Sequence, residues 1–266
     1  MGVLNVTPDS FSDGGRFLDP DAAVAQGERL IADGAEILDV GGESTRPGAD
    51  PVSEEEELAR TVEVVRALAG RGAEVSIDTT TVGVARAALE AGAGIVNDVA
   101  AFRVEPELAG LVADSGARCC LMHMLGEPRT MQDDPRYGDV VDDVRAFLEE
   151  RLAFAVGEGI AEERVWLDPG IGFGKTVDHN LELLRRLAEI VAIGRPVLVG
   201  TSRKSFLAKV AGRGRVGPLA GTVASNVLAL ERGASVFRVH DVAEVRDALR
   251  VAAAVVRPSE HGAAGA

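Results

Sequence analysis

The sequence predicts a single (β/α)8 barrel, the TIM-barrel class of α/β folds, with mobile loops at its C-terminal face. Its 266 residues match the usual length of such a barrel. Short apolar segments recur along the chain, and each is followed by a loop and a helical pattern. The composition shows no break that would mark a second domain. We therefore expect one barrel domain over residues 1–257 and a flexible C-terminal tail over 258–266.

The apolar segments are typical of parallel strands that are buried on both faces, because each is nearly continuous. They lie at residues 3–6, 36–40, 74–78, 94–98, 118–122, 165–168, 196–201 and 235–239. Eight segments in 266 residues correspond to about 33 residues per repeat, the size of one strand-and-helix unit of a barrel. A doubly wound sheet usually has fewer strands, so the barrel is the better prediction.

The segments between the strands contain amphipathic helices and three long loops. Residues 21–34 end on a glycine, and residues 54–70 begin with an acidic first turn, as helices commonly do. Long turn-rich loops follow the first, second and fifth strands, at residues 7–20, 41–53 and 123–139. Because binding residues are often carried on such loops, we expect these three to act as lids over a site.

Composition and charge exclude several classes of partner. The chain carries 28 basic and 42 acidic residues, a net charge of −14, which opposes binding to nucleic acid or to anionic lipid. No apolar run approaches the roughly 18 residues that a membrane span needs. The two cysteines, Cys119 and Cys120, are adjacent on one strand, so they cannot form a disulfide framework. We expect a cytoplasmic protein that acts on small molecules, with no nucleic acid or membrane partner.

Every predicted strand ends in polar residues, and in a barrel these ends converge on one mouth. The set comprises Asn5, Asp39, Asp78, Asn97, Asp98, His123, Asp168, Ser202, Arg203, Lys204, Arg238 and His240. Ionisable groups are rarely found on buried strands without partners, so this set of residues predicts a ligand-binding site. Asp39 and Asp98 could instead orient or cap neighbours, and His123 could be a packed core histidine, so we leave these three out of the predicted site.

The charges are sorted around the predicted mouth. Strands three, four and six supply acidic and amide groups, whereas strands seven and eight supply basic ones, at the usual phosphate corner of a barrel. This arrangement indicates a bipolar ligand with hydrogen-bond donors at one end and phosphate at the other. Asn5 could add an oxygen ligand to Mg²⁺ on that phosphate, or it could simply cap a turn.

Two other motifs do not support the chemistry that they suggest. The run PGIGFGKT at 169–176 ends like a nucleotide-binding P-loop, but Pro169 stands where the first glycine is required. The histidines and cysteines do not have the spacing of zinc ligands. The sequence therefore predicts neither nucleotide hydrolysis nor a transition-metal site.

From residue 1 to about 250 the chain resembles the dihydropteroate synthases. The resemblance rests on the order and spacing of MGVLNVTPDSFSDGG, DVGGESTRPGA, SIDT, NDV, LMHMLGEPRTMQ, LDPGIGFGKT, GTSRKSF and RVHDV. It implies a pterin-binding barrel and a transferase of folate biosynthesis. Such an enzyme joins (7,8-dihydropterin-6-yl)methyl diphosphate to 4-aminobenzoate and releases diphosphate, so its substrate is bipolar.

Carried over position by position, the resemblance implies a pterin site made of Asp78, Asn97, Val99, Met122, Asp168, Phe173, Lys204 and Arg238. Asp168 would accept a forked pair of hydrogen bonds from the amino-pyrimidinone edge, and Lys204 would contact the ring carbonyl. Val99, Met122 and Phe173 would line the apolar walls, and the Arg238 guanidinium would stack on the ring. For Val99 and Met122, ordinary core packing is the alternative interpretation.

The resemblance also implies the sites of the other reacting groups. The diphosphate would contact Asn5, Thr45, Arg238 and His240, with Mg²⁺ at Asn5. Asp13 would stabilise the pterin methyl cation, and the catalytic set would be Asp13, Lys204, Arg238 and His240. The 4-aminobenzoate pocket would include Phe11, Arg46, Pro47 and Ser205, and Phe11 and Pro47 match a sulfonamide-susceptible pattern.

Members of this family commonly form homodimers through outer helices, and the apolar helical patterns near 217–255 would allow such a face here. Two alternatives stay open. A pterin-dependent methyltransferase barrel would use similar ring contacts but would leave the basic segments 202–204 and 238–240 without a diphosphate to bind. A non-catalytic paralogue would bind pterin without turning it over.

Overall fold

The computed structural model describes residues 1–7, 20–43, 52–127, 129–214 and 216–256. Several sequence predictions therefore lie outside the described residues: the tail at 258–266, Phe11, Asp13, Thr45, Arg46 and Pro47. The statements below concern the described residues.

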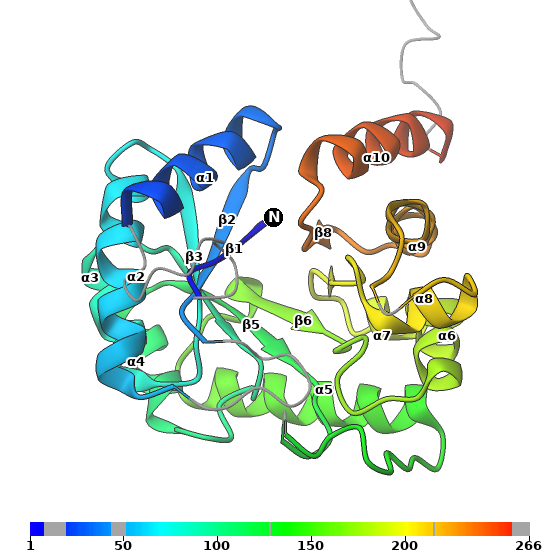
Figure 1. Ribbon diagram of the computed structural model, residues 1–266. Coiled ribbons are helices and arrows are strands. Elements are labelled where there is room, and N and C mark those ends of the chain that lie inside the picture. Colours follow the sequence, from blue (N-terminus) through cyan, green and yellow to red (C-terminus); the bar gives the residue numbers. More distant parts are fainter. Residues whose placement is uncertain (8–19, 44–51, 128, 215, 257–266) are drawn as a thin grey trace, which may run out of the picture.

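The eight predicted strands are present and form a closed parallel barrel (Figure 1). The first six pair in chain order: β1 (Gly2–Asn5), β2 (Ile37–Gly41), β3 (Glu74–Asp78), β4 (Ile95–Asp98), β5 (Arg118–Met122) and β6 (Val165–Asp168). The last two, β7 (Leu198–Val199) and β8 (Val236–Phe237), pair with each other. Single bridges join Leu167 to Val197 and Gly2 to Val239, and these close the ring. The predicted fold class is confirmed.

Helices surround the strands in the order expected of this fold (Figure 1). They are α1 (Pro20–Ala32), α2 (Glu54–Ala69), α3 (Val82–Glu90), α4 (Glu107–Ser115), α5 (Val140–Gly157), a 3-10 turn η2 (Glu162–Arg164), α6 (Val177–Arg185), α7 (Leu187–Val191), α8 (Ser205–Val210), α9 (Leu219–Glu231) and α10 (Val242–Val256). The predicted helices at 21–34 and 54–70 correspond to α1 and α2. Ser53 caps α2 by accepting a hydrogen bond from the Glu56 amide, and glutamates fill the first turn.

Successive strand residues face alternately toward the helices and into the barrel, and this alternation positions the site. Val96, Leu121 and Leu167 belong to the large core cluster packed against the helices. Cys120 and Trp166 belong to a separate cluster that fills the barrel interior. The two cysteines therefore point to opposite faces, and both are free thiols. No helix in the described part of the chain is both long and apolar enough to cross a membrane.

One buried acid in the helical layer, Glu57, should make the unfolding free energy depend on pH. Glu57 on α2 is buried, and burial raises its pKa to about 7, against a hydrogen bond from Thr79 that lowers it. Between about pH 4.5 and 7 the folded state keeps a proton that the unfolded state has lost, so Glu57 makes the unfolding free energy fall as pH rises.

We expect Glu57→Gln to remove this penalty. In denaturant unfolding, variant and parent should have equal stability below pH 4.5, and the variant should gain up to about 3 kcal/mol above pH 7, since one pKa unit corresponds to about 1.4 kcal/mol. A constant difference at all pH values would show that Glu57 does not titrate in this range. Glu63→Gln, on the exposed face of the same helix, is the matched control.

Candidate active site

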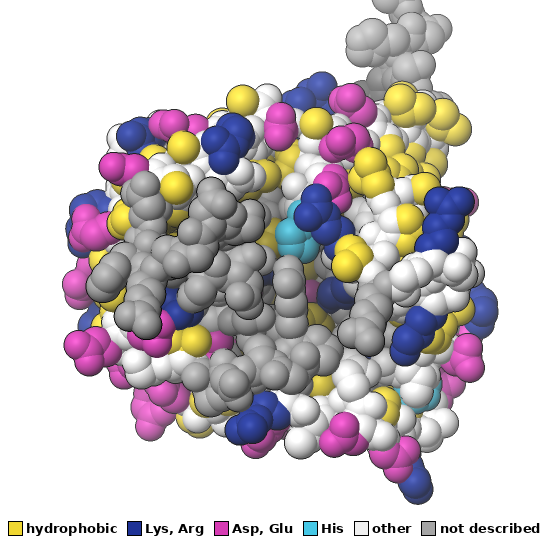
Figure 2. Space-filling view, viewed as in Figure 1, with side chains coloured by type: hydrophobic (Ala, Val, Ile, Leu, Met, Phe, Trp, Pro, Cys, Tyr) yellow, Lys and Arg dark blue, Asp and Glu magenta, His cyan; other side chains and the backbone are white. Residues whose placement is uncertain are grey.

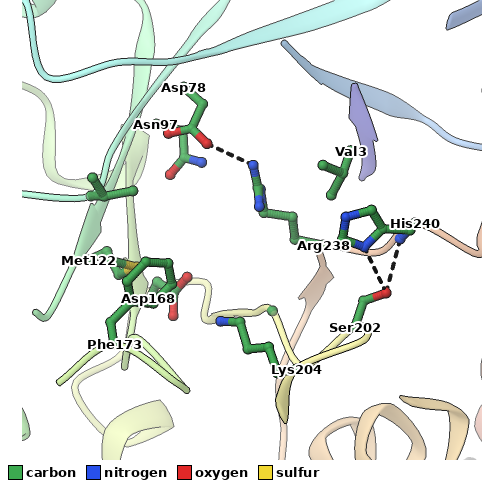
Figure 3. A pocket seen from close by; sticks show the side chains of 12 residues that line it. Val3, Asp78, Asn97, Met122, Asp168, Phe173, Ser202, Lys204, Arg238 and His240 are labelled. Carbon is green, nitrogen blue, oxygen red and sulfur yellow. Dashed lines mark hydrogen bonds and ion pairs between the residues drawn. The ribbon is translucent and has the colours of Figure 1, made fainter. Parts of the chain in front are cut away.

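A pocket opens at the C-terminal mouth of the barrel (Figure 3). Its lining comes from five strands, β1 and β3 to β6, and from the segments that follow β4, β6, β7 and β8: Val3, Asp78, Asn97, Val99, Met122, Asp168, Phe173, Gly200, Ser202, Lys204, Arg238 and His240. Every residue that the resemblance carried over to the pterin ring lies in this lining, together with His240. Asn5 and Ser205 do not, although Asn5 follows Val3 by two residues and so lies on the same face of β1.

Arg238 links β2 and β3 by hydrogen bonds to an aspartate of each strand. Its Nε donates to Asp39 Oδ2 at 2.5 Å, and its Nη2 donates to Asp78 Oδ2 at 2.7 Å. Asp39 Oδ2 also accepts from Asn97 Nδ2 at 3.1 Å. Asp39 is fully buried and does not line the pocket, so it orients Arg238 and Asn97 from below. These hydrogen bonds are consistent with an orienting role for Asp39.

These contacts decide the charge of the acidic cluster. Burial raises the pKa of Asp78 to about 7, although the neighbouring Arg238 lowers it. Burial disfavours the charged form of Arg238, but Asp39 and Asp78 outweigh that effect and raise its pKa. Arg238 therefore stays a cation in the pocket, and the buried Asp78 carboxyl has a higher pKa than an exposed one.

Asp168 and Lys204 are the second set of oppositely charged residues in the pocket, and each shifts the pKa of the other. Asp168 Oδ1 accepts from the Gly170 amide at 2.7 Å, and burial raises the pKa of Asp168 while Lys204 opposes this. Lys204 Nζ lies 4.5 Å from the centroid of the Phe173 ring and donates to the Ile171 carbonyl. Burial lowers the pKa of Lys204 to about 8. Figure 3 shows its ammonium pointing toward Asp168.

Ser202 and His240 occupy the other side of the pocket. The Ser202 Oγ accepts from the His240 amide at 3.1 Å and lies 3.0 Å from His240 Nδ1. Sequence reasoning noticed Ser202 at a strand end but did not assign it to the site. Arg203, which the sequence placed with the basic residues of this corner, instead forms an ion pair with Asp241 and is half exposed. The basic corner therefore consists of Lys204, Arg238 and His240.

Two residues left out of the predicted site have the structural roles considered for them. Both oxygens of Asp98 accept backbone hydrogen bonds at 2.7 Å, from Ala100 and Phe102, and so cap a turn in which Ala101 and Phe102 have positive φ. His123 packs edge-on against Phe147 with ring centroids 4.8 Å apart. It is a buried core histidine.

The glycine-rich segment after β6 is a close-packed turn and not a phosphate cradle. Gly170, Gly172 and Gly174 have φ values of 65°, 87° and 59°. A Cβ at Gly170 would lie 1.8 Å from the His123 carbonyl oxygen, and one at Gly174 would lie 2.5 Å from that of Leu125. The glycines are needed because this backbone lies directly on the segment after β5.

The donor set fits a magnesium ion only together with a phosphorylated ligand. The described residues include no group of three carboxylate, histidine or cysteine side chains that could hold a metal by themselves. Mg²⁺ commonly binds through few protein oxygens and completes its shell with substrate phosphate and water. A single amide oxygen such as that of Asn5 suits this mode.

Comparison with known proteins agrees with this geometry. Residues 1–240 match the family described as pterin binding enzyme. A dihydropteroate synthase from Mycobacterium leprae is 50% identical over 96% of this chain and 92% of its own length. The structure of the Xanthomonas albilineans dihydropteroate synthase in complex with 7,8-dihydropteroate matches with a TM-score of 0.85 at 44% identity, over 96% of this chain and 92% of that one. That of the Yersinia pestis enzyme with a sulfonamide drug complex matches with a TM-score of 0.89 at 43% identity, over 96% and 92%.

The fold, the pocket and these matches define a pterin-binding transferase barrel. Within that class, the chain belongs to the dihydropteroate synthase family.

Proposed function

We propose that this chain condenses (7,8-dihydropterin-6-yl)methyl diphosphate with 4-aminobenzoate, giving 7,8-dihydropteroate and diphosphate in folate biosynthesis, in the pocket at the barrel mouth. The observation that carries the proposal is that one pocket brings together acidic, amide and cationic groups from different strands. Acidic and amide groups of β3, β4 and β6 face cationic groups that follow β7 and β8. A pterin joined to a diphosphate has the matching polarity.

The pterin ring binds between the apolar walls of Val99, Met122 and Phe173. Asp168 accepts hydrogen bonds from the amino-pyrimidinone edge, because a carboxylate can accept from two adjacent donors at once. Lys204 contacts the ring carbonyl and balances the buried charge of Asp168. Asp78 and Asn97 bind the opposite polar edge, and Arg238 stacks on the ring while it remains paired with Asp78.

The diphosphate lies against Arg238, His240, Asn5 and Thr45. As the bond between the methylene carbon and the diphosphate oxygen breaks, its electron pair leaves with the diphosphate, and Arg238 and His240 stabilise the developing charge. Asn5 would hold Mg²⁺ beside the diphosphate, and the ion would supply further neutralisation of that charge. Ser202 orients His240 for this contact through the hydrogen bond to its ring.

The methylene cation left on the pterin is attacked by the amino nitrogen of 4-aminobenzoate, which then loses a proton. Asp13 stabilises the cation, and Lys204 orders the ring that shares its charge. Phe11, Arg46, Pro47 and Ser205 hold the 4-aminobenzoate above the pterin. Ser205 follows Lys204 directly and begins α8 with an exposed side chain, which is accessible to a ligand at the mouth.

The decisive measurement is release of pyrophosphate by the purified protein in the presence of Mg²⁺. We expect release only when the pterin diphosphate and 4-aminobenzoate are both present, with omission of each substrate as the control. Tight pterin binding without any release would favour a non-catalytic paralogue. Methyl transfer to a corrinoid would favour the methyltransferase barrel.

We also propose a cytoplasmic homodimer that pairs through α9 and α10. The two free, buried cysteines suit a reducing compartment. Leu228 on α9 and Val251 and Val255 on α10 are 46%, 67% and 79% exposed. Figure 2 shows apolar side chains gathered at the upper right, where Figure 1 places these helices. A contiguous exposed apolar face of this kind is typical of an interaction site.

We expect Val255→Glu to convert the dimer to a monomer, because it places a charge on this apolar face. Light scattering coupled to gel filtration would measure the mass of parent and variant. Val104→Glu, at another exposed valine in the loop before α4, is the matched control and should keep the parent mass. A dimeric Val255→Glu protein would contradict the proposed interface.

A further inference from the structure

Lys175 is a buried basic residue with no part in the proposed chemistry. It belongs to the run PGIGFGKT, and it is one of three lysines in the sequence, with Lys204 and Lys209. Its side chain is only 3% exposed and does not line the pocket. Fully buried lysines are rare and normally have a specific set of partners.

The Lys175 amine makes three hydrogen-bonding contacts. Its Nζ lies 2.9 Å from His123 Nδ1, 3.0 Å from the Phe173 carbonyl and 3.3 Å from the His123 carbonyl. An ammonium donates to all three acceptors. A neutral amine, which burial favours by lowering the pKa of Lys175, donates to the two carbonyls and accepts from Nδ1–H. The three contacts therefore exist in either protonation state.

These contacts tie together two segments that build the pterin subsite. His123 directly follows Met122 at the end of β5, and Phe173 belongs to the glycine turn after β6. Met122 and Phe173 both line the pocket. The Phe173 ring is itself in contact with Lys204 Nζ at 4.5 Å, and Ile171 in the same turn accepts a hydrogen bond from Lys204. The position of the turn thus affects both the aromatic wall and the Lys204 ammonium.

The turn needs such a tether because its own sequence provides little rigidity. Three of its residues are glycines with positive φ, and glycine loses more conformational freedom on ordering than other residues. Side chains outside the turn hold its backbone in place by hydrogen bonds. Asn180 Oδ1 accepts from the Gly172 amide at 2.6 Å, and Tyr137 Oη donates to the Gly174 carbonyl at 2.7 Å. Lys175 is the one among these that holds the carbonyl of Phe173.

We propose that Lys175 is a positioning residue of the pterin subsite, which fastens the Phe173 turn to the end of β5 and so holds the ring of Phe173 against the bound pterin. The inference rests on the proposed function, because it assumes that the pterin occupies this pocket. The residue acts through Phe173 and does not touch the ligand.

The first test is Lys175→Met, which keeps the length of the side chain and removes its hydrogen bonds. We expect the KM for the pterin diphosphate to rise about tenfold or more, while the KM for 4-aminobenzoate stays within about twofold of the parent value. Lys209→Met, at the exposed lysine of α8, is the matched control and should leave both constants unchanged. An unchanged KM for the pterin diphosphate in Lys175→Met would overturn the proposal.

The second test separates a positioning role from general stabilisation. If Lys175 acts through Phe173, Lys175→Met should cost little further pterin affinity in a Phe173→Ala background, whereas independent effects would multiply in full. Calorimetric binding of the pterin diphosphate without 4-aminobenzoate measures this, and it does so even if the protein shows no turnover. Failure of the proposed reaction is therefore distinguishable from failure of the tether. Should Lys175→Met not fold, Lys175→Gln, which keeps two donors on a shorter side chain, decides the same comparison.

Discussion

Replacing Asp168 by Asn is expected to abolish detectable binding of the pterin diphosphate. The substitution preserves the size of the side chain but exchanges one acceptor oxygen for an NH2 donor, which would face the donors of the pterin edge. Loss of one hydrogen bond to a charged group, together with a buried NH2 donor left without an acceptor, costs about 3–6 kcal/mol, which corresponds to roughly 10²–10⁴-fold in the dissociation constant. Titration calorimetry with the pterin diphosphate alone measures this loss.

Two further variants test whether the loss of binding is specific to Asp168. Asp178→Asn removes an exposed carboxylate at the start of α6 and should leave binding unchanged. Asp13→Ala should keep pterin diphosphate binding and lose mainly turnover, because Asp13 is proposed to act on the cation that forms after the diphosphate departs. Parent-like affinity in Asp168→Asn would contradict the assigned orientation of the pterin. Full turnover in Asp13→Ala would contradict the role given to Asp13.

The fold was predictable because the sequence contains eight apolar strand segments at the spacing of a barrel. The face of each strand residue was not predictable, since strands buried on both sides show no clear alternation of polar and apolar residues. Asp39 and Asp98 illustrate the consequence. Both are acids within or at the end of an apolar strand, yet Asp39 faces into the barrel and orients Arg238, whereas Asp98 caps a turn.

The site was predictable where a residue lies at a strand end and faces the mouth, as Asp168 and Arg238 do. It was not predictable where turn geometry decides the direction. Ser202 and Arg203 are neighbours after β7, but Arg203 has a φ of 60° and pairs with Asp241, while Ser202 lines the pocket beside His240. Lys175 shows a third limit, because His123, which supplies two of its three contacts, lies 52 residues away in the sequence and no local pattern indicates it.

Besides stacking on the pterin ring, Arg238 has two proposed electrostatic roles, as counter-ion of a buried acidic pair and as the cation that stabilises the departing diphosphate. We expect Arg238→Met to lower the unfolding free energy at pH 8 by about 3–5 kcal/mol, because it leaves Asp39 and Asp78 buried without their cation. We also expect kcat to fall by roughly 10²–10³-fold, as for other donors that stabilise a developing anion. Denaturant unfolding and pyrophosphate release measure the two effects separately.

The dependence on pH identifies the structural part of the Arg238 effect. The pKa of Asp78 is already raised to about 7 with Arg238 present, and loss of the cation raises it further. In the variant, the folded state therefore holds protons that the unfolded state has lost, so its unfolding free energy falls as pH rises. The stability difference from the parent should therefore widen between pH 5 and pH 8, by up to about 1.4 kcal/mol for each pH unit above 7. A difference that is independent of pH would mean that the lost packing of Arg238, and not its charge, sets the cost.

A double variant separates the two roles. Asp39→Asn combined with Arg238→Met removes a buried charge that does not line the pocket, and should recover a measurable part of the stability at pH 8. It should recover none of the turnover, because the cation that faces the diphosphate is still absent. If turnover returned together with stability, Arg238 would act only as a counter-ion, and the charge of the leaving group would be stabilised by His240, Mg²⁺ and the loop residues instead. The same pair of measurements thus tests the fold and the mechanism on one side chain.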